Sequence, residues 1–256
     1  MLHEDRERAE SFGAVAELYD RARPSYPPAL IDALLESHPR RVLDVGCGTG
    51  IATALLAQRG CDVLGVEIDA RMAAVAGGKG LAVEVARFED WDDAGRRFDI
   101  VTSAQAWHWV DPTTGAAKAA AVLADGGSVG LFWNMGEPPA AVRDALVPVY
   151  ARLAPQLRDS FSAVPEKRGV RVEQTIAGLE RSGAFAPAQL RTFAWSQTYD
   201  TDAWVERVST KSEHQTLPRE LRGRLLAGVR DALDALGGSF AMAHETVLVS
   251  ASLLPR

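Results

Sequence analysis

The sequence predicts an α/β fold built on a doubly wound, mostly parallel sheet. Between residues 41 and 134, five short runs rich in Val, Leu and Ile alternate with helical segments. These runs are apolar nearly throughout, as parallel strands covered on both faces should be. Two later strand-like runs extend the expected sheet to seven strands. Repeated strand and helix units of this kind form parallel sheets with crossover helices.

The five core strands are predicted where the sequence has RVLDV, DVLGVE, LAVEVA, FDIVTSA and SVGLFW, starting at residues 41, 62, 81, 98 and 128. A helix is expected after the first of them, over 51–58. Its stripe would carry Ile51, Ala54, Leu55 and Gln58, and Gly60 stands where a C-terminal cap belongs.

After residue 134 the pattern changes to helical segments interrupted by prolines, over 137–161 and 170–183. The segment 189–199 alternates and places Phe193, Trp195 and Tyr199 on one face, which indicates a strand. An amphipathic helix over 218–236 precedes the final strand at 239–252. The expected architecture is a Rossmann-like seven-stranded sheet with an antiparallel last strand and a helical cap inserted after strand five.

Composition limits the classes of partner. The chain of 256 residues has a formal charge of −6, which argues against a general affinity for nucleic acid. Its charged start, MLHEDRERAESF, lacks the apolar core of a signal peptide, and no apolar run approaches the ~20 residues that span a bilayer. The two cysteines lack CxxC spacing, so we expect no disulfide framework or metal site. A cytoplasmic protein without a membrane partner is predicted.

Three glycines follow the first strand, at Gly46, Gly48 and Gly50. The dinucleotide fingerprint G-x-G-x-x-G fails here, because Ile51 takes the place of its last glycine. Asp44 lies beneath the loop, where a carboxylate would repel a pyrophosphate and favour an ammonium or sulfonium cation. S-adenosylmethionine carries both cations. An acid at the end of the second strand, Glu67, is placed to accept hydrogen bonds from ribose hydroxyls.

The segments VLDVGCGTG, GVEIDARM and FDIVTSAQAWHWVDP resemble motifs of the class I S-adenosylmethionine-dependent methyltransferases. The resemblance is to the small-molecule branch that includes ubiquinone-biosynthesis-like and trans-aconitate-methyltransferase-like enzymes. It covers residues 12–134 well and the remainder in architecture. The segment YDRARPSYPPALIDALL at 19–35 also resembles the part of such proteins that precedes the first strand.

The resemblance implies a cofactor site along the carboxyl ends of the strands. Asp44 would lie near the methionine ammonium, Glu67 would hold the ribose and Met72 would pack on the adenine. Arg87 stands where the family usually presents an acid to the adenine, so Phe88 and Glu89 would substitute. The implied cofactor positions are Asp44, Gly46, Cys47, Gly48, Glu67, Ile68, Met72, Phe88, Glu89, Ala104 and Gln105.

The segment after the fourth strand is expected to line the acceptor pocket with Trp107, His108 and Trp109. Core packing is the alternative for the two tryptophans. His108 is a candidate general base, with a structural hydrogen bond as the alternative.

In the resembling family, an N-terminal segment folds over the active site as a lid, which makes Tyr19, Arg23 and Tyr26 candidate substrate contacts. Tyr19 is also a candidate catalytic residue, because its ring can face a sulfonium.

A single domain is predicted, with lid helices at 1–38, a cofactor-binding core at 39–134, a cap with strand six at 135–215 and a final helix and strand at 216–256. Acceptor specificity is expected from 137–215, through Trp195, Tyr199, Trp204 and His214.

The predicted activity is methyl transfer from S-adenosylmethionine to an O, N or C atom of a small molecule by in-line displacement. Two alternatives stay open. A nicotinamide-dependent oxidoreductase is disfavoured by Asp44 and Ile51. A non-catalytic S-adenosylmethionine-binding protein is compatible with every motif. The identity of the acceptor, the use of a general base and the oligomeric state do not follow from the sequence.

Overall fold

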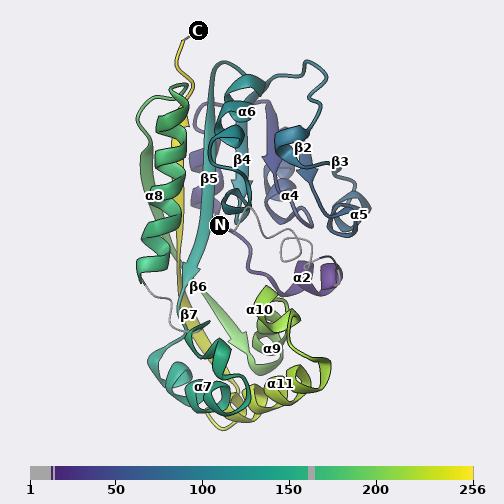
Figure 1. Ribbon diagram of the computed structural model, residues 1–256, viewed down its shortest axis with the longest axis vertical. Coiled ribbons are helices and arrows are strands. Elements are labelled where there is room, and N and C mark those ends of the chain that lie inside the picture. The colour runs from purple at the N-terminus through teal and green to yellow at the C-terminus, as the bar shows by residue number, and fades with distance from the viewer. Residues whose placement is uncertain (1–12, 14, 161–164, 256) are drawn as a thin grey trace.

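The computed structural model describes residues 13, 15–160 and 165–255. Its centre is a seven-stranded sheet with the order β3-β2-β1-β4-β5-β7-β6 (Figure 1). The strands are β1 (Arg41–Val45), β2 (Asp62–Glu67), β3 (Ala82–Val85), β4 (Phe98–Ala104), β5 (Leu123–Gly136), β6 (Gln189–Asp200) and β7 (Ser239–Ser252). The pairs among the first five strands are parallel, and β7 is antiparallel to both β5 and β6. The predicted fold class is confirmed.

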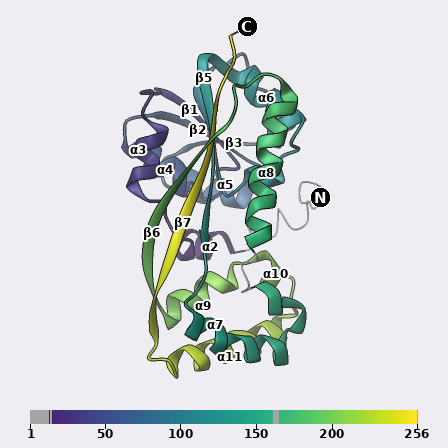
Figure 2. The same ribbon diagram turned by 90° about the vertical axis from the view of Figure 1, so that its left-hand side faces the viewer.

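Helices cover both faces of the sheet. They are α2 (Ala16–Ala22), α3 (Pro28–Leu34), α4 (Ile51–Gln58), α5 (Ala70–Gly78), α6 (Thr114–Val122), α7 (Ala140–Leu153), α8 (Pro165–Ser182), α9 (Thr201–Ser209), α10 (Ser212–Gln215) and α11 (Arg219–Asp234). Short 3₁₀ segments in the described part of the chain include η3 (Phe88–Asp90), η4 (Trp107–Trp109) and η5 (Pro155–Ser160). One apolar core lies under α3 and α4, and another lies under α6 and α8 on the opposite face (Figure 2).

The expected stripe of the first core helix was wrong. In α4 the buried side chains are Ala52, Thr53 and Leu56, whereas Ile51 and Leu55 are only partly buried. The helix is apolar around most of its circumference, so periodicity alone does not single out the face that packs on the sheet. The glycine expected at its end, Gly60, has a left-handed φ of 88°.

A third core forms the cap at the far end of the long strands β6 and β7 (Figure 1). It joins α7, α9 and α11, and its buried aromatic residues are Tyr150, Tyr199 and Trp204. The cap differs in composition from the predicted insertion. Helix α8 lies within residues 135–215 but packs against α6, η4 and β7. Helix α11, from the C-terminal segment, packs on α7 and α9 instead.

Helix α2 connects the sheet domain to the cap. It contacts α5 on one side and α9 on the other. Asp20 forms an ion pair with Lys79, whose Nζ also donates to the carbonyl of Thr49 at 2.9 Å. On the cap side, Arg21 pairs with Glu206 at 3.2 Å. Residues 1–12 of the predicted lid lie outside the described residues. No helix among the described residues has the length and apolarity needed to cross a membrane.

Candidate active site

The glycine loop after β1 adopts backbone angles that favour glycine. Gly46 and Gly48 have φ values of 65° and 58°. A Cβ on Gly46 would lie 2.4 Å from the Cβ of Ala106, so this position needs glycine for close packing against the segment after β4. A Cβ on Gly48 would meet only Cε of Met72, at 3.5 Å, among the described atoms. The loop therefore presents its backbone to a space bounded by Met72.

Glu67 ends β2 beside this loop. The amide of Gly48 donates to Oε2 of Glu67 at 2.8 Å, and the amide of Asp69 donates to Oε1 at 2.9 Å. The residue is only 8% exposed, and burial raises the pKa of its carboxyl group. A nearly buried carboxylate next to an open glycine loop fits the ribose hydroxyls of a nucleoside.

Asp44 lies beneath the loop and is completely buried. Its two carboxylate oxygens accept hydrogen bonds from Thr53, at 2.7 Å, and from Thr102, at 3.1 Å. Burial raises the pKa of Asp44 to about 6, although both hydroxyls act in the opposite direction. In the described part of the chain no lysine or arginine pairs with this carboxylate. The floor of the site therefore carries a negative charge that an ammonium group would stabilise.

The two threonines were not predicted as site residues. Thr53 stands in an otherwise apolar segment of the sequence, IATALLA, and Thr102 follows the apolar pair Ile100 and Val101 in FDIVTSA. A polar side chain inside a buried run needs a hydrogen-bond partner, and this requirement is the signal that identifies them.

The segment around α2 lies over this site. The guanidinium of Arg23 stacks on the ring of Tyr19 at 4.6 Å and donates to the carbonyl of Thr210 at 2.9 Å. Tyr26 packs edge-on against Phe132, with ring centroids 5.0 Å apart. Burial raises the pKa of Tyr26, and the charges of Tyr19 and Asp44 raise it further. The three predicted lid residues thus lie within electrostatic reach of one another, and Tyr26 also lies within reach of Asp44.

The segment after β4 differs from its prediction. Trp107 is 3% exposed and belongs to the main core, with its ring centroid 6.1 Å from that of Phe88. For Trp107 the structure therefore favours core packing, the alternative to lining the acceptor pocket. His108 and Trp109 contact each other, with ring centroids 5.1 Å apart.

The indole Nε1 of Trp133 donates to Nδ1 of His108 at 3.2 Å. An indole nitrogen is a donor only, so Nδ1 must be the acceptor and the neutral ring carries its proton on Nε2. This hydrogen bond uses the lone pair that a general base needs. The geometry therefore favours the structural alternative for His108.

The side chains next to Arg87, where the family usually presents an acid to the adenine, contact other residues of the protein. Glu89 pairs with Arg87 at 3.2 Å and accepts a hydrogen bond from the amide of Asp111 at 2.8 Å. The ring of Phe88 is buried and stacks on Trp91 with a centroid distance of 6.5 Å. The side chains of Phe88 and Glu89 thus hold η3 against η4. This arrangement does not support the predicted adenine contact through the Glu89 carboxylate.

The other predicted cofactor positions lie along the same edge of the sheet. Cys47 is buried against Gly65 of β2, and Ile68 directly follows Glu67. Ala104 ends β4, and Gln105 after it has a left-handed φ of 60°.

A chain of hydrogen bonds runs from this edge towards the cap. Gln105 donates to the carbonyl of Asn134 at 3.1 Å, and the side chain of Asn134 accepts from Thr246 at 2.6 Å. The indole of Trp195 donates to Thr246 at 2.9 Å. The chain crosses β5, β7 and β6, so it links the predicted cofactor edge to the predicted specificity segment.

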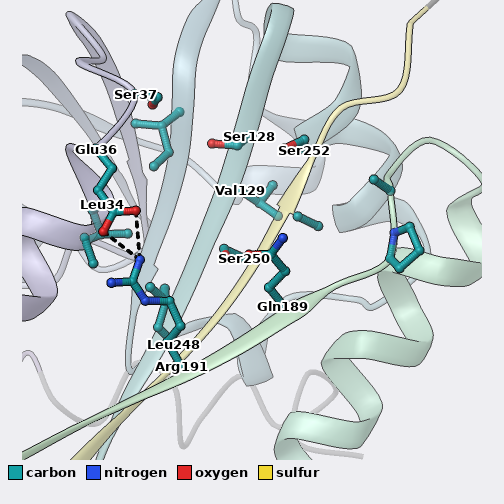
Figure 3. Close-up of a pocket in the computed structure, with 15 residues that line it drawn as sticks. Leu34, Glu36, Ser37, Ser128, Val129, Gln189, Arg191, Leu248, Ser250 and Ser252 are labelled. Atoms are coloured by element: carbon teal, nitrogen blue, oxygen red, sulfur yellow. Dashed lines mark hydrogen bonds and ion pairs between the residues drawn. The ribbon is translucent and has the colours of Figure 1, made fainter.

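A separate pocket of about 200 Å³ lies at the opposite end of the sheet, near the start of β4 (Figure 3). Its lining mixes apolar residues such as Leu34 and Leu248 with polar residues such as Ser128, Gln189 and Ser250. Arg191 and Glu36 form an ion pair at its edge at 2.8 Å. Since these two charges satisfy each other, the pocket supplies no obvious reactive group.

Comparison with known proteins decides the family. Residues 19–131 match the family model described as a methyltransferase domain. The chain is 34% identical over 258 aligned positions to an uncharacterized methyltransferase of Mycobacterium tuberculosis, covering 97% of this chain and 98% of the relative. The chain belongs to the class I S-adenosylmethionine-dependent methyltransferases. Its cofactor is S-adenosylmethionine, and the comparisons do not support the nicotinamide alternative.

The following three proteins share less of this methyltransferase's sequence. A ubiquinone biosynthesis O-methyltransferase of Bordetella avium is 32% identical over 56% of this chain and 64% of its own length. A solved structure from Anaeromyxobacter dehalogenans, provisionally named a type II methyltransferase, has a TM-score of 0.67 and 24% identity, covering 91% of this chain and 99% of its own. Phosphoethanolamine N-methyltransferase 2 of Haemonchus contortus, solved with S-adenosyl-L-methionine, has a TM-score of 0.55 and 15% identity, with 100% and 60% coverage. The structural likenesses show the shared fold.

Proposed function

We propose that this methyltransferase transfers a methyl group to an O, N or C atom of a small molecule held between the glycine loop and the cap. S-adenosylmethionine, when bound, supplies a methyl group on a sulfonium with a neutral leaving group. The observation that carries the proposal is the open glycine loop with two buried acids, Asp44 and Glu67, beneath a lid anchored on both sides.

Each acid has its own role in binding. Asp44 attracts the ammonium of the cofactor's methionine end, because its charge is buried and has no cationic partner among the described residues. Glu67 accepts hydrogen bonds from ribose hydroxyls. Met72 bounds the same space and offers an adaptable apolar surface to the adenine.

The lid excludes water and aligns the acceptor. Tyr19 presents an aromatic ring next to the site, and the Asp20–Lys79 ion pair together with the bond from Lys79 to Thr49 fastens α2 to the glycine loop. Alignment of two reactants can lower a barrier by roughly 7 to 11 kcal/mol, so displacement at a sulfonium needs little further catalysis. This account requires no base from His108.

The test is a binding and transfer experiment. Calorimetry should show binding of S-adenosylhomocysteine and no binding of NAD. Labelled S-adenosylmethionine, incubated with small carboxylates, phenols and amines, should yield a labelled product. Tight NAD binding without a response to S-adenosylhomocysteine would overturn the proposal. Binding without transfer to any small molecule would favour the non-catalytic alternative.

A further inference from the structure

Three cationic side chains lie within electrostatic reach of one another between the lid and the cap. They are Arg23, which follows α2, Arg207 on α9 and Lys211, which precedes α10. We call them the cap cation cluster. Arg23 donates to both the hydroxyl and the carbonyl of Thr210, at 3.0 and 2.9 Å, which places its guanidinium beside the end of α9. The charges of Arg23 and Arg207 both lower the pKa of Lys211, so the three groups lie within electrostatic reach of one another.

The cluster lacks sufficient negative charge of its own. Within the part of the chain that the structure describes, no carboxylate forms an ion pair with Arg23 or Arg207. The guanidinium of Arg207 instead donates to the hydroxyl of Tyr199 and stacks over Trp204 at 5.3 Å. Glu213 is the acid that acts on Lys211, and its effect is smaller than that of burial. Counted over the described residues alone, three cations and one acid leave an excess of positive charge.

This excess is costly because the groups are desolvated. Burial is the largest cause of the lowered pKa of Lys211, to about 8, and of the lowered pKa of Arg207. Yet all three cluster side chains keep part of their surface accessible. Charges removed from bulk water are normally paired with an opposite charge. Accessible cations without enough acids are therefore suited to a diffusible anion.

The cluster also adjoins the transfer site. The guanidinium of Arg23 stacks on the ring of Tyr19. The charges of Arg23 and Asp44 both act on the pKa of Tyr26. Arg23 therefore stands between the cofactor floor and the cap. Figure 2 shows α2 beside α9 and α10 at this junction. An acceptor that reached from the cluster to the glycine loop would cross the space beneath the lid.

We propose that the methyl acceptor carries a carboxylate or phosphate group that binds Arg23, Arg207 and Lys211. This inference rests on the proposed function and adds the charge class of its acceptor. Planar guanidinium groups bind both oxyanions in a bidentate manner, and Lys211 adds a point charge. The anion anchors the acceptor at the cap end and leaves its reacting atom towards the glycine loop.

The test uses the full chain, with and without bound S-adenosylhomocysteine. Thermal-shift and calorimetric titrations would compare succinate with succinamide, benzoate with benzamide, and inorganic phosphate with no addition. At least one anion should bind and raise the melting temperature, while its neutral amide should not. The carboxylate and phosphate arms distinguish the two oxyanions. Lys211→Gln and Arg23→Gln should each weaken binding of that anion roughly 10- to 100-fold, as expected for a lost charge-assisted hydrogen bond.

Matched variants keep the result interpretable. Arg207→Gln could unfold the cap, so Arg207→Lys, which keeps the charge, serves as the second variant and should retain most of the affinity. Arg230→Gln removes a surface cation of the same cap, paired with Asp202 at 2.6 Å, and should leave anion binding unchanged.

The two proposals fail in different ways. If S-adenosylhomocysteine binds but no anion does, or if Lys211→Gln and Arg23→Gln bind anions like the unmodified protein, the anionic acceptor is refuted. If S-adenosylhomocysteine fails to bind, the proposed function is refuted, and the titrations of the ligand-free protein still decide whether the cluster is an anion site.

Discussion

The amide of Gly48 donates to the carboxylate of Glu67 across 2.8 Å, joining the loops that follow β1 and β2. Because β1 and β2 are parallel neighbours with Val45 opposite Val66, their carboxyl ends meet at one edge. The same acid also accepts from the amide of Asp69, which caps the start of α5. Glu67 therefore couples the shape of the glycine loop to the position of the helix that carries Met72.

Glu67→Gln should weaken binding of S-adenosylhomocysteine by about 1.5 to 3 kcal/mol, the scale of a hydrogen bond to a charged group. A carboxamide has one acceptor oxygen in place of the two equivalent oxygens of the carboxylate. It therefore cannot accept hydrogen bonds from the amides of Gly48 and Asp69 and from the ribose hydroxyls at the same time. Calorimetry measures the change. Glu84→Gln is the control, since Glu84 on β3 pairs with Arg96 at 2.6 Å. An unchanged dissociation constant in folded Glu67→Gln would place the ribose contact elsewhere.

Affinity for S-adenosylhomocysteine should fall as the pH drops through about 6, the pKa to which burial raises Asp44. Protonation removes the charge that attracts the ligand's ammonium. Asp44→Asn should bind weakly at every pH and lose this dependence. Glu67, whose pKa is also raised, remains in the variant, so the difference between the two curves isolates Asp44.

In the ligand-free protein, the contribution of Asp44 to the free energy of unfolding should fall as the pH rises towards about 6. A carboxyl group with a raised pKa binds more protons in the folded state than in the unfolded state between its ordinary pKa and about 6. Its favourable contribution is therefore lost as the pH rises through about 6. Melting curves of Asp44→Asn should lack this part of the decline. Parallel pH profiles of the two proteins would contradict the assignment.

Anion binding at the cap cation cluster should weaken as the pH rises through about 8, because Lys211 then loses its charge. Glu213 on α10 raises the pKa of Lys211, while Arg207 on α9 and Arg23 after α2 lower it. Lys211→Arg should bind the anion identified by titration with no loss between pH 7 and 9, since a guanidinium stays protonated. A loss of equal size in Lys211→Arg would assign the pH dependence to another group.

Lys211 also has a predictable effect on stability. Its folded pKa is lowered from 10.5 to about 8, so the unfolded chain binds more protons between these values. Stability should therefore rise with pH across this window. Lys211→Gln should flatten that rise, as thermal melts at pH 8 and 10 would show. An unaltered rise in Lys211→Gln would mean that another group titrates there.

His108→Ala should keep the turnover number within about tenfold, because its Nδ1 lone pair accepts from Trp133. A general base typically contributes ~10²- to 10⁴-fold. Steady-state kinetics with an identified acceptor separates the two roles. A loss of that larger size, with affinity unchanged, would return His108 to catalysis. Trp133→Phe, which frees the His108 lone pair, is the matched variant.

Deleting residues 1–22 should sharply reduce methyl transfer and leave the sheet folded. The deletion removes Tyr19 and the Asp20–Lys79 ion pair but keeps Tyr26 packed on Phe132. Water exclusion and alignment are lost, while the three cores lose none of their described residues. Circular dichroism and S-adenosylhomocysteine binding verify folding. Full turnover by the truncated protein would refute the lid.

The amino-acid sequence by itself determined the parallel core and the edge of the sheet at which Asp44 and Glu67 lie. Short apolar runs bounded by turns indicate buried parallel strands. Acids that end neighbouring parallel strands must lie at one edge of the sheet. Asp44 and Glu67 were therefore placed correctly at strand ends. Gly46 and Gly48 follow from the same local reasoning, because their φ angles belong to the turn itself.

Only the tertiary structure decided which side chains face which partner. Trp107 packs into the core rather than a pocket, and α4 buries a face that its uniformly apolar sequence does not distinguish. Arg23 meets Thr210 from 187 residues away, so no local pattern could pair the lid with α9. Such contacts depend on long-range packing of segments that are each amphipathic or charged in an ordinary way. The sequence therefore identifies the methyl donor, and the proposal about the acceptor rests on the geometry of the cap.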